Sequence, residues 1–139
     1  MKLIVDTNIV LAAVIRDSTT RRLLFEPRLE LLSPDFLFEE GKRHTQEDED
    51  IRVKTGLSTD ELTALFEMAC TRIKLVPFSE YSEKIQEAKK LSKHKEDEPY
   101  FAVALKTRCP IWSSDKGMME QNEVEIITTG QLISWLNGE

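Results

Sequence analysis

Cysteine and histidine are both scarce in this sequence, whose 139 residues include two of each. Cys70 and Cys109 lie in apolar-rich segments without CxxC spacing. A disulfide framework or zinc site is therefore not expected, and the thiols are predicted to stay reduced, as in a cytosolic protein. His44 and His94 have no metal-ligand spacing to another histidine or cysteine. We expect surface or packing roles for them rather than catalytic ones.

Long apolar runs are missing as well. No stretch reaches the ~18 apolar residues that a membrane-spanning helix needs. The opening segment MKLIVDTNIVLAAVI is largely apolar, but Asp6 and Asn8 interrupt it. It also lacks the basic region and cleavage site of a secretory signal. We expect no membrane span, no signal peptide and a cytoplasmic location.

An excess of positive charge is the third absence, since the formal net charge is −6. Proteins that bind nucleic acid are usually basic, so this balance argues against a main role in holding duplex DNA. It does not exclude an enzyme whose acidic residues are concentrated at a metal site. The densest charge run, Glu47 to Asp50, is predicted to solvate an exposed helix or loop.

The residues that are present predict one globular α/β domain over residues 1–139. Hydrophobic residues make up 40% and charged residues 32% of the chain, a globular composition, and we find no repeat or linker. Strands are predicted at residues 3–5, 29–33, 73–76, 111–113 and 125–127. Helices are predicted at 8–16, 18–25 with Ser18 as N-cap, from Pro34 through His44, 62–72 behind a capping box at 58–61, 79–91, 99–107 and 131–136. Strands that alternate with helices indicate a mainly parallel sheet, and Trp112 and Trp135 are expected in the core.

Acidic residues recur where predicted strands end. Asp6 closes the first strand, and Asp115 follows the strand that begins at Ile111. Ligands of parallel sheets bind at the carboxyl ends of the strands. Asp97 precedes the helix that begins near Pro99, where a negative charge suits the helix dipole, and Glu40 lies on the helix after the second strand. Each acid alone could be a cap or turn residue, but together they predict a carboxylate cluster.

Such a cluster has a specific chemistry. Neighbouring carboxylates repel one another and raise their pKa values, which a divalent cation relieves. Oxygen ligands without nearby imidazole or thiolate favour Mg²⁺ or Mn²⁺ over zinc. A site of this kind suits phosphodiester hydrolysis.

Four segments, in order, resemble the motifs of the PIN-domain family, including its VapC-like ribonucleases. They are LIVDTN with Asp6, SPDFLFEEGKRH with Glu40, EDEPYFAVAL with Asp97, and IWSSDKGM with Asp115 and Ser113. The tail EIITTGQLISWL resembles the family's last strand and helix, so the similarity covers nearly the whole chain. Glu39 adjoins Glu40, which leaves the choice of glutamate open, and Gly41 stands where the family usually has a bulky apolar residue.

The resemblance implies a three-layer α/β/α fold and a metal-dependent endoribonuclease that cuts single-stranded RNA. Asp6, Asp97 and Asp115 would bind Mg²⁺ or Mn²⁺, and Glu40 would complete the site directly or through water. Asn8 and Ser113 would orient ligands or water. It also implies a homodimer and, if the chain is a toxin, an antitoxin partner. Six residues flank the first two acids and form either a basic rim for RNA or scattered solvated side chains: Arg16, Arg21, Arg22, Lys42, Arg43 and His44.

Three other functions were weighed. A haloacid-dehalogenase-type phosphatase needs a second carboxylate two residues after the first, where this chain has Asn8. A phosphoacceptor receiver domain needs paired acids after its first strand and an acceptor aspartate in mid-chain, and Asp6 suits neither. A non-catalytic PIN-fold protein that binds metal or RNA, or acts as a scaffold, stays open as the alternative to an enzyme.

Overall fold

Five parallel strands form one central sheet in the computed structural model, which describes residues 1–15 and 18–138. The strands are β1 (Lys2–Val5), β2 (Glu30–Pro34), β3 (Ile73–Val76), β4 (Ile111–Trp112) and β5 (Ile126–Ile127). Their order across the sheet is β3-β2-β1-β4-β5, and every neighbouring pair is parallel. The predicted strands and the parallel sheet are therefore confirmed.

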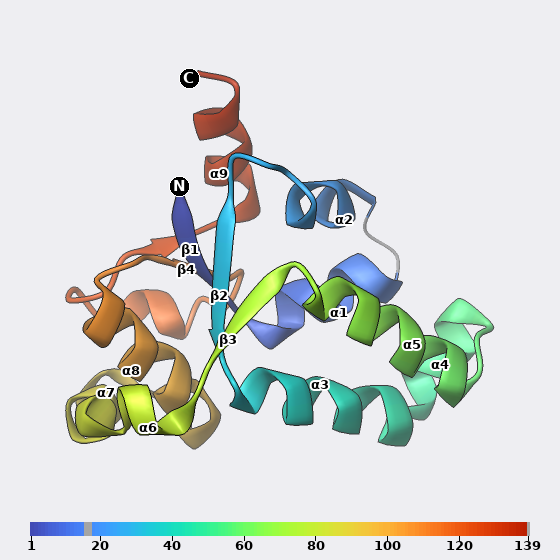
Figure 1. The fold of residues 1–139 in the computed structure, drawn as a ribbon, viewed down its shortest axis with the longest axis horizontal. Coiled ribbons are helices and arrows are strands. Elements are labelled where there is room, and N and C mark those ends of the chain that lie inside the picture. The colour runs from blue at the N-terminus through green and yellow to red at the C-terminus, as the bar shows by residue number, and fades with distance from the viewer. Residues whose placement is uncertain (16–17, 139) are drawn as a thin grey trace.

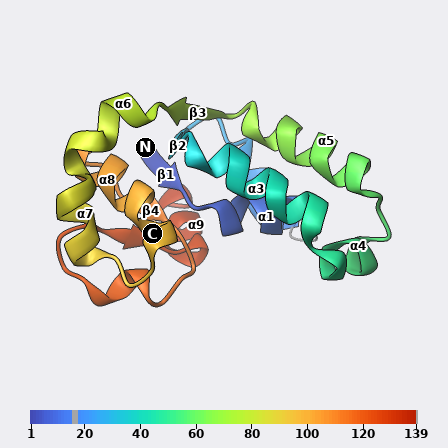
Figure 2. The same cartoon turned by 90° about the horizontal axis from the view of Figure 1, so that it is seen from below.

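Helices cover the sheet on both sides (Figures 1 and 2). One layer comprises α1 (Thr7–Ile15), α2 (Ser18–Leu24), α3 (Phe36–Glu47), α4 (Glu49–Thr55) and α5 (Thr59–Cys70). The other comprises α6 (Phe78–Tyr81), α7 (Ile85–Leu91) and α8 (Glu98–Thr107), and α9 (Thr129–Leu136) follows β5. This arrangement confirms the three-layer α/β/α fold. None of the described helices is long and apolar enough to cross a membrane.

The order of the strands reverses at β1. The chain runs outward from β1 to β2 and β3, then returns through α6, α7 and α8 to place β4 on the other side of β1. Open parallel sheets bind ligands in the crevice at such a switch point, beyond the carboxyl ends of the strands. We therefore expect the ligand site among the residues that follow β1 and β4.

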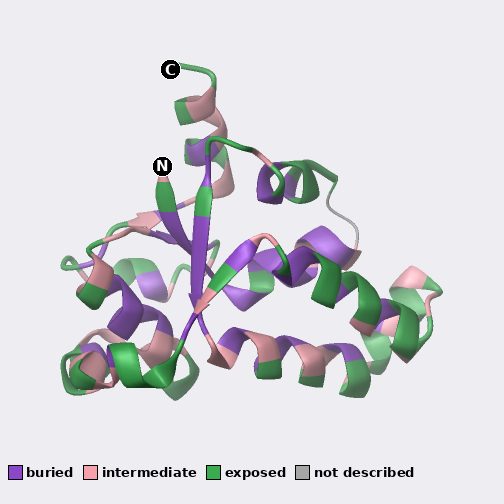
Figure 3. Cartoon of the chain, in the orientation of Figure 1, coloured by how far each residue is buried: buried purple, intermediate pink, exposed green. Residues whose placement is uncertain are grey.

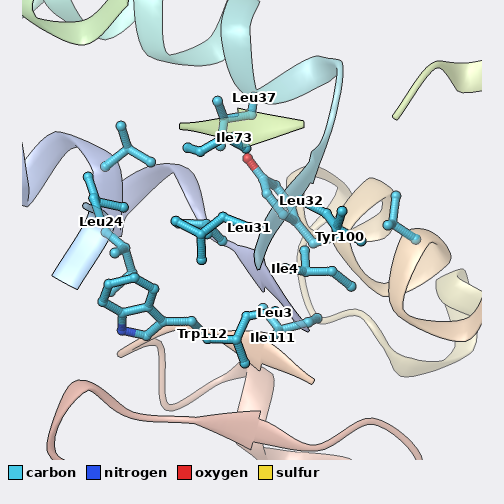
Figure 4. Close-up of a cluster of buried hydrophobic side chains, with 14 of the residues drawn as sticks. Leu3, Ile4, Leu24, Leu31, Leu32, Leu37, Ile73, Tyr100, Ile111 and Trp112 are labelled. Atoms are coloured by element: carbon cyan, nitrogen blue, oxygen red, sulfur yellow. The ribbon is translucent and has the colours of Figure 1, made fainter. Parts of the chain in front are cut away.

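The core is built on β1, whose residues Leu3, Ile4 and Val5 are fully buried (Figures 3 and 4). Each such side chain contributes about 1.5–3 kcal/mol relative to an exposed one. Trp112 is also fully buried, as predicted. The prediction for Trp135 was wrong: it lies near the end of α9 and is 46% exposed.

Several element boundaries differ from the prediction. Pro34 does not open a helix but ends β2, where it pairs with Val76. A proline is tolerated there because the paired residues of β1 and β2 end at Ile4 and Leu32, so Pro34 needs no N–H for β1. Ser18 is the first residue of α2 rather than its cap. Arg16, the predicted end of the first helix, lies outside the described residues.

The predicted helix over 79–91 is divided into α6, a 3₁₀ turn at Ser82–Lys84 and α7. Asp35 anchors the first part, because its carboxylate accepts hydrogen bonds from the Tyr81 hydroxyl (2.9 Å) and the Phe78 amide (3.1 Å). The prediction also missed α4, which buries only Ile51 and so has too weak an apolar pattern. The acidic run enters α4 and is largely exposed, as predicted.

Gly41 allows α3 and α5 to pack closely. A Cβ atom added there would lie 1.9 Å from Cζ of Phe66, a fully buried ring on α5. The small residue at this position therefore leaves the space that the Phe66 ring fills.

We expect Gly41→Ala to destabilise the protein by about 1–3 kcal/mol through overpacking, although alanine favours helix. Urea unfolding measures the change. Gly130→Ala in α9 is the matched control, since its nearest non-adjacent atom would be 3.9 Å away. Equal stability of the two variants would contradict this account of α3–α5 packing.

Candidate active site

Asp6 and Ser113 meet at the carboxyl ends of β1 and β4. The Asp6 amide donates to the Trp112 carbonyl at 3.2 Å, which continues the pairing of these strands. The Ser113 hydroxyl donates to Oδ2 of Asp6 at 2.8 Å, and both side chains are buried. The adjacent strand ends thus fix the position of the first predicted acid.

Ser113 also connects Asp6 to Asp115. Its hydroxyl oxygen accepts a hydrogen bond from the Asp115 amide at 3.0 Å. Oδ1 of Asp115 in turn accepts from the Gly117 amide at 2.8 Å, which fixes the carboxylate in the loop after β4. Ser113 therefore holds two of the acids in place.

Glu40, rather than Glu39, faces the other acids. Glu39 is exposed, whereas Glu40 is buried on α3. Oε1 of Glu40 accepts hydrogen bonds from the Thr7 hydroxyl (2.5 Å) and the Tyr100 hydroxyl (3.0 Å), and these two hydroxyls also contact each other. The glutamate is thus fixed from α1 and from α8.

Sequence analysis missed Thr7 and Tyr100. Thr7 directly follows Asp6, and Tyr100 lies three residues after Asp97, near the start of α8. A spacing of three places two residues on one side of a helix, so the position of Tyr100 beside an acid was a usable signal. Aromatic residues on a helix more often pack in the core, and Tyr100 is only 2% exposed (Figure 4).

All four predicted acids line one cavity of about 250 Å³ at this end of the sheet. The complete lining is Asp6, Thr7, Asn8, Glu40, His44, His94, Glu96, Asp97, Tyr100 and Asp115. The structure thus brings Asn8 to the cavity as well, with Ser113 behind it. It also places both histidines in the wall, of which only His44 was linked to the site beforehand, as part of the candidate basic rim.

The predicted basic rim is largely absent from this cavity. Arg16 lies outside the described residues. Arg21 donates to the Ala13 carbonyl at 2.9 Å and lines a different cavity, between α1, α2 and α5. Lys42 lies over the Phe38 ring, 5.2 Å from its centroid. Of the described residues predicted for the rim, His44 alone lines the acidic cavity.

Burial and mutual repulsion make the acids easier to protonate. Burial is the main reason that the pKa of Asp6 rises from 3.8 to about 6, and the charges of Glu40 and Asp97 raise it further against the hydrogen bond from Ser113. Burial also raises the pKa of Asp97, with Asp115 as the next cause. Oδ2 of Asp97 is buried without a hydrogen-bond partner. For Asp97 the charge of His94 offsets these effects only in part.

The ligand chemistry fits a hard divalent cation such as Mg²⁺ or Mn²⁺. The candidate ligands are carboxylate oxygens. One of them, Oδ2 of Asp97, accepts no hydrogen bond. Across residues 1–15 and 18–138, no group of three or more His, Cys, Asp or Glu side chains is arranged to hold a metal ion. The acids surround the cavity without forming a preassembled set of ligands.

Comparison with known proteins identifies the family. The family model described as PIN domain matches residues 4–131. The chain belongs to the PIN-domain family. Asp6, Glu40, Asp97 and Asp115 all fall within the matched PIN domain.

Solved structures agree on the fold of this PIN domain. It is similar to a chain in the crystal structure of VapBC2 from Rickettsia felis bound to a DNA fragment from their promoter, with a TM-score of 0.69 and 12% sequence identity. The likeness covers 92% of the present chain and 98% of the other. At this identity the similarity concerns the fold. No curated protein matches the chain.

The raised pKa of Asp6 has a measurable effect on stability. Between pH 3.8 and about 6 the folded state binds a proton that the unfolded state has lost, so this group lowers stability as the pH rises through that window. The full penalty, at most about 3 kcal/mol for a shift of about two units, is present above it. Without divalent cations, Asp6→Asn should therefore raise the melting temperature at neutral pH.

Thermal unfolding in EDTA at about pH 7.5 and about pH 3.5 tests this expectation, since the advantage of the variant should disappear at the lower pH. Asparagine can still accept the hydrogen bond from Ser113, so the two proteins differ mainly in charge. Glu39→Gln, at an exposed carboxylate, should change little at either pH. An Asp6→Asn variant with the same advantage at both values would contradict the assigned cause.

Proposed function

We propose that this PIN domain is a metal-dependent endoribonuclease that hydrolyses phosphodiester bonds of single-stranded RNA. The observation that carries the proposal is the cavity at the carboxyl ends of β1 and β4, where acids from four separate segments meet. Buried carboxylates without positive partners are costly, so they are explained best by a charged ligand. Carboxylate oxygens favour a hard divalent cation, although the imidazoles of His44 and His94 also line the cavity.

The residues of the cavity suggest a division of roles. Asp6, Asp97 and Asp115 would hold Mg²⁺ or Mn²⁺, with Glu40 completing the site directly or through water. When bound, such an ion lowers the pKa of water and stabilises the leaving oxygen. Ser113 orients Asp6 through its 2.8 Å hydrogen bond. Asn8, exposed at the edge of the cavity, is placed to orient water or substrate.

The choice of RNA as substrate rests on the PIN-domain family and on the charge of the chain. A net charge of −6 is poorly suited to a protein that holds a long duplex by its phosphates. A single strand can instead present one phosphate to a small acidic cavity once a cation is bound. Both cysteines are free, which is compatible with the cytoplasmic location that an RNA substrate suggests.

A role as the toxin of a toxin–antitoxin pair is part of the proposal. The similar solved structure is VapBC2 bound to a DNA fragment from their promoter. By analogy, we propose an antitoxin protein as partner and a homodimer as the assembly. The mass of the purified protein in solution tests the dimer.

A non-catalytic role in metal or RNA binding is the second candidate. The observation that favours it is that no three ligand side chains in the described ranges are already arranged around a metal position. The acid set favours the enzyme, because a scaffold has no need for four carboxylates around one cavity, two of them buried.

Incubation with labelled single-stranded RNA separates the two candidates. We expect cleavage with Mg²⁺ or Mn²⁺, none with EDTA, and a loss of roughly 100-fold or more in Asp6→Asn, because removal of a catalytic group commonly costs several kcal/mol. Exposed Glu39→Gln should keep its activity. Cleavage no faster in the parent protein than in Asp6→Asn would favour a binding role.

Two tyrosine variants test whether the hydroxyl of Tyr100 orients Glu40. Tyr100→Phe and Tyr81→Phe each remove a buried hydroxyl bonded to a carboxylate, Glu40 or Asp35. Each should therefore lose about 1–2 kcal/mol of stability in urea unfolding. In calorimetric titration with Mn²⁺, only Tyr100→Phe should weaken metal binding. The expected loss is roughly 10-fold, because removal of a group that orients a metal ligand commonly lowers affinity by that amount.

Asp97→Asn and Asp115→Asn serve as references in the same titration, and both should weaken Mn²⁺ binding more than Tyr100→Phe does. An unchanged affinity in either would remove that aspartate from the metal site. An equal loss in Tyr81→Phe and Tyr100→Phe would mean that stability, rather than the orientation of Glu40, governs binding.

A further inference from the structure

The acidic cavity poses an electrostatic problem for a substrate that is itself an anion. Its lining includes five carboxylates, those of the four predicted acids and of Glu96. Of the described residues that line it, none is lysine or arginine. A bound cation offsets part of this charge, but each phosphate of RNA still needs hydrogen-bond donors that point toward it.

Two of the nearby lysines are engaged elsewhere. Lys93 forms an ion pair with Glu120, and Lys42 lies over the Phe38 ring. The side chains of the cavity that combine ring N–H donors with a possible positive charge are those of His44 and His94.

His44 lies one helical turn beyond Glu40 on α3. Residues four apart are neighbours on one side of a helix, so the imidazole follows the carboxylate along the same wall of the cavity. Its side chain is half-buried, which leaves the ring accessible from the opening.

His94 approaches from the opposite layer of the sheet. It precedes the 3₁₀ segment Lys95–Asp97 that leads into α8, and its carbonyl accepts the Asp97 amide at 3.0 Å. The residue is exposed, yet close enough to Asp97 to lower the pKa of that carboxyl, against the effect of burial. The two imidazoles therefore flank the acids from α3 on one side and from the start of α8 on the other.

We propose that His44 and His94 are substrate-binding residues whose ring N–H groups donate to non-bridging oxygens of the RNA phosphate held over the carboxylate cluster. The proposal rests on the proposed function for its substrate and deepens it by naming the phosphate contacts. A pair of donors on opposite walls fixes the phosphate between them, which aligns the backbone across the cavity.

The test measures RNA binding, RNA cleavage and metal binding separately. Binding of a short fluorescein-labelled single-stranded RNA is followed by anisotropy with Ca²⁺ in place of Mn²⁺, cleavage kinetics use Mn²⁺, and calorimetry measures Mn²⁺ binding without RNA. The variants are His44→Ala, His94→Ala and the double variant. Arg43→Ala and Lys95→Ala are matched controls, because each removes an exposed cation adjacent to one histidine but outside the cavity lining.

We expect each histidine variant to lower RNA affinity and kcat/KM roughly 10-fold, the low end for a hydrogen bond to a charged group, and the double variant roughly 100-fold. Mn²⁺ affinity should stay within about twofold, since the histidines are not assigned as ligands. His44→Gln and His94→Gln, which keep an N–H donor, should recover part of the loss. Each control should lose less than threefold.

The outcomes that overturn the proposal differ from those that overturn the nuclease. A parallel loss of Mn²⁺ affinity would make the histidines metal ligands, and losses equal to those of the controls would make them ordinary surface residues. Neither result would contradict the proposed nuclease function. If the protein binds RNA through the histidines but does not cleave it, the result supports this proposal and rejects the nuclease function. A protein that neither binds nor cleaves RNA would reject both.

Discussion

The pairing of β1 with β4 is the constraint on which the site depends. Ile4 and Val5 pair with Ile111 and Trp112, residues that are far away in the sequence and fully buried. This pairing places Ser113 beside Asp6 and fixes the loop that contains Asp115. Because apolar burial holds the two strands together, the energy that positions the acids comes from the core rather than from the acids themselves.

The carboxylates oppose the stability that the core provides. Asp6 is buried with a raised pKa, and Asp97 has a buried oxygen without a partner. Glu40, by contrast, receives two hydroxyl hydrogen bonds, from Thr7 and Tyr100. Functional sites commonly retain such unfavourable groups where the surrounding fold is stable enough to hold them. The site thus combines Glu40 on α3, held by two hydroxyls, with Asp6 after β1 and Asp97 before α8, whose carboxylates are destabilised by burial.

Much of the fold was predictable because its strands are short, apolar and buried. The run Leu3 to Val5 and the segment Ile73 to Val76 both became strands, and Asp6 and Asp115 were found because each follows such a run. The sequence could not choose between Glu39 and Glu40, since a helical pattern alone does not fix which of two adjacent residues faces inward. That choice depends on the rotation of α3, which the contact of Gly41 with Phe66 sets.

Other features depended on contacts between distant segments. The bonds of Thr7 and Tyr100 to Glu40 join α1, α3 and α8, and no local pattern encodes them. The division between α6 and α7 follows the bonds of Tyr81 and Phe78 to Asp35, which is equally remote in sequence. The prediction for Trp135 was wrong because an aromatic residue on an amphipathic helix usually packs in the core, whereas this one, near the end of α9, is largely exposed.

The distance along the chain between β1 and β4 has a consequence for synthesis. Asp6 leaves the ribosome more than a hundred residues before its hydrogen-bond partner Ser113 and the acid Asp115. Contacts of such long range form late, because the intervening chain must be ordered first. A nascent chain that contains only the first half therefore has Asp6 and Glu40 but not the remaining acids. The cavity therefore stays incomplete until the segment from Asp97 to Asp115 has been synthesised.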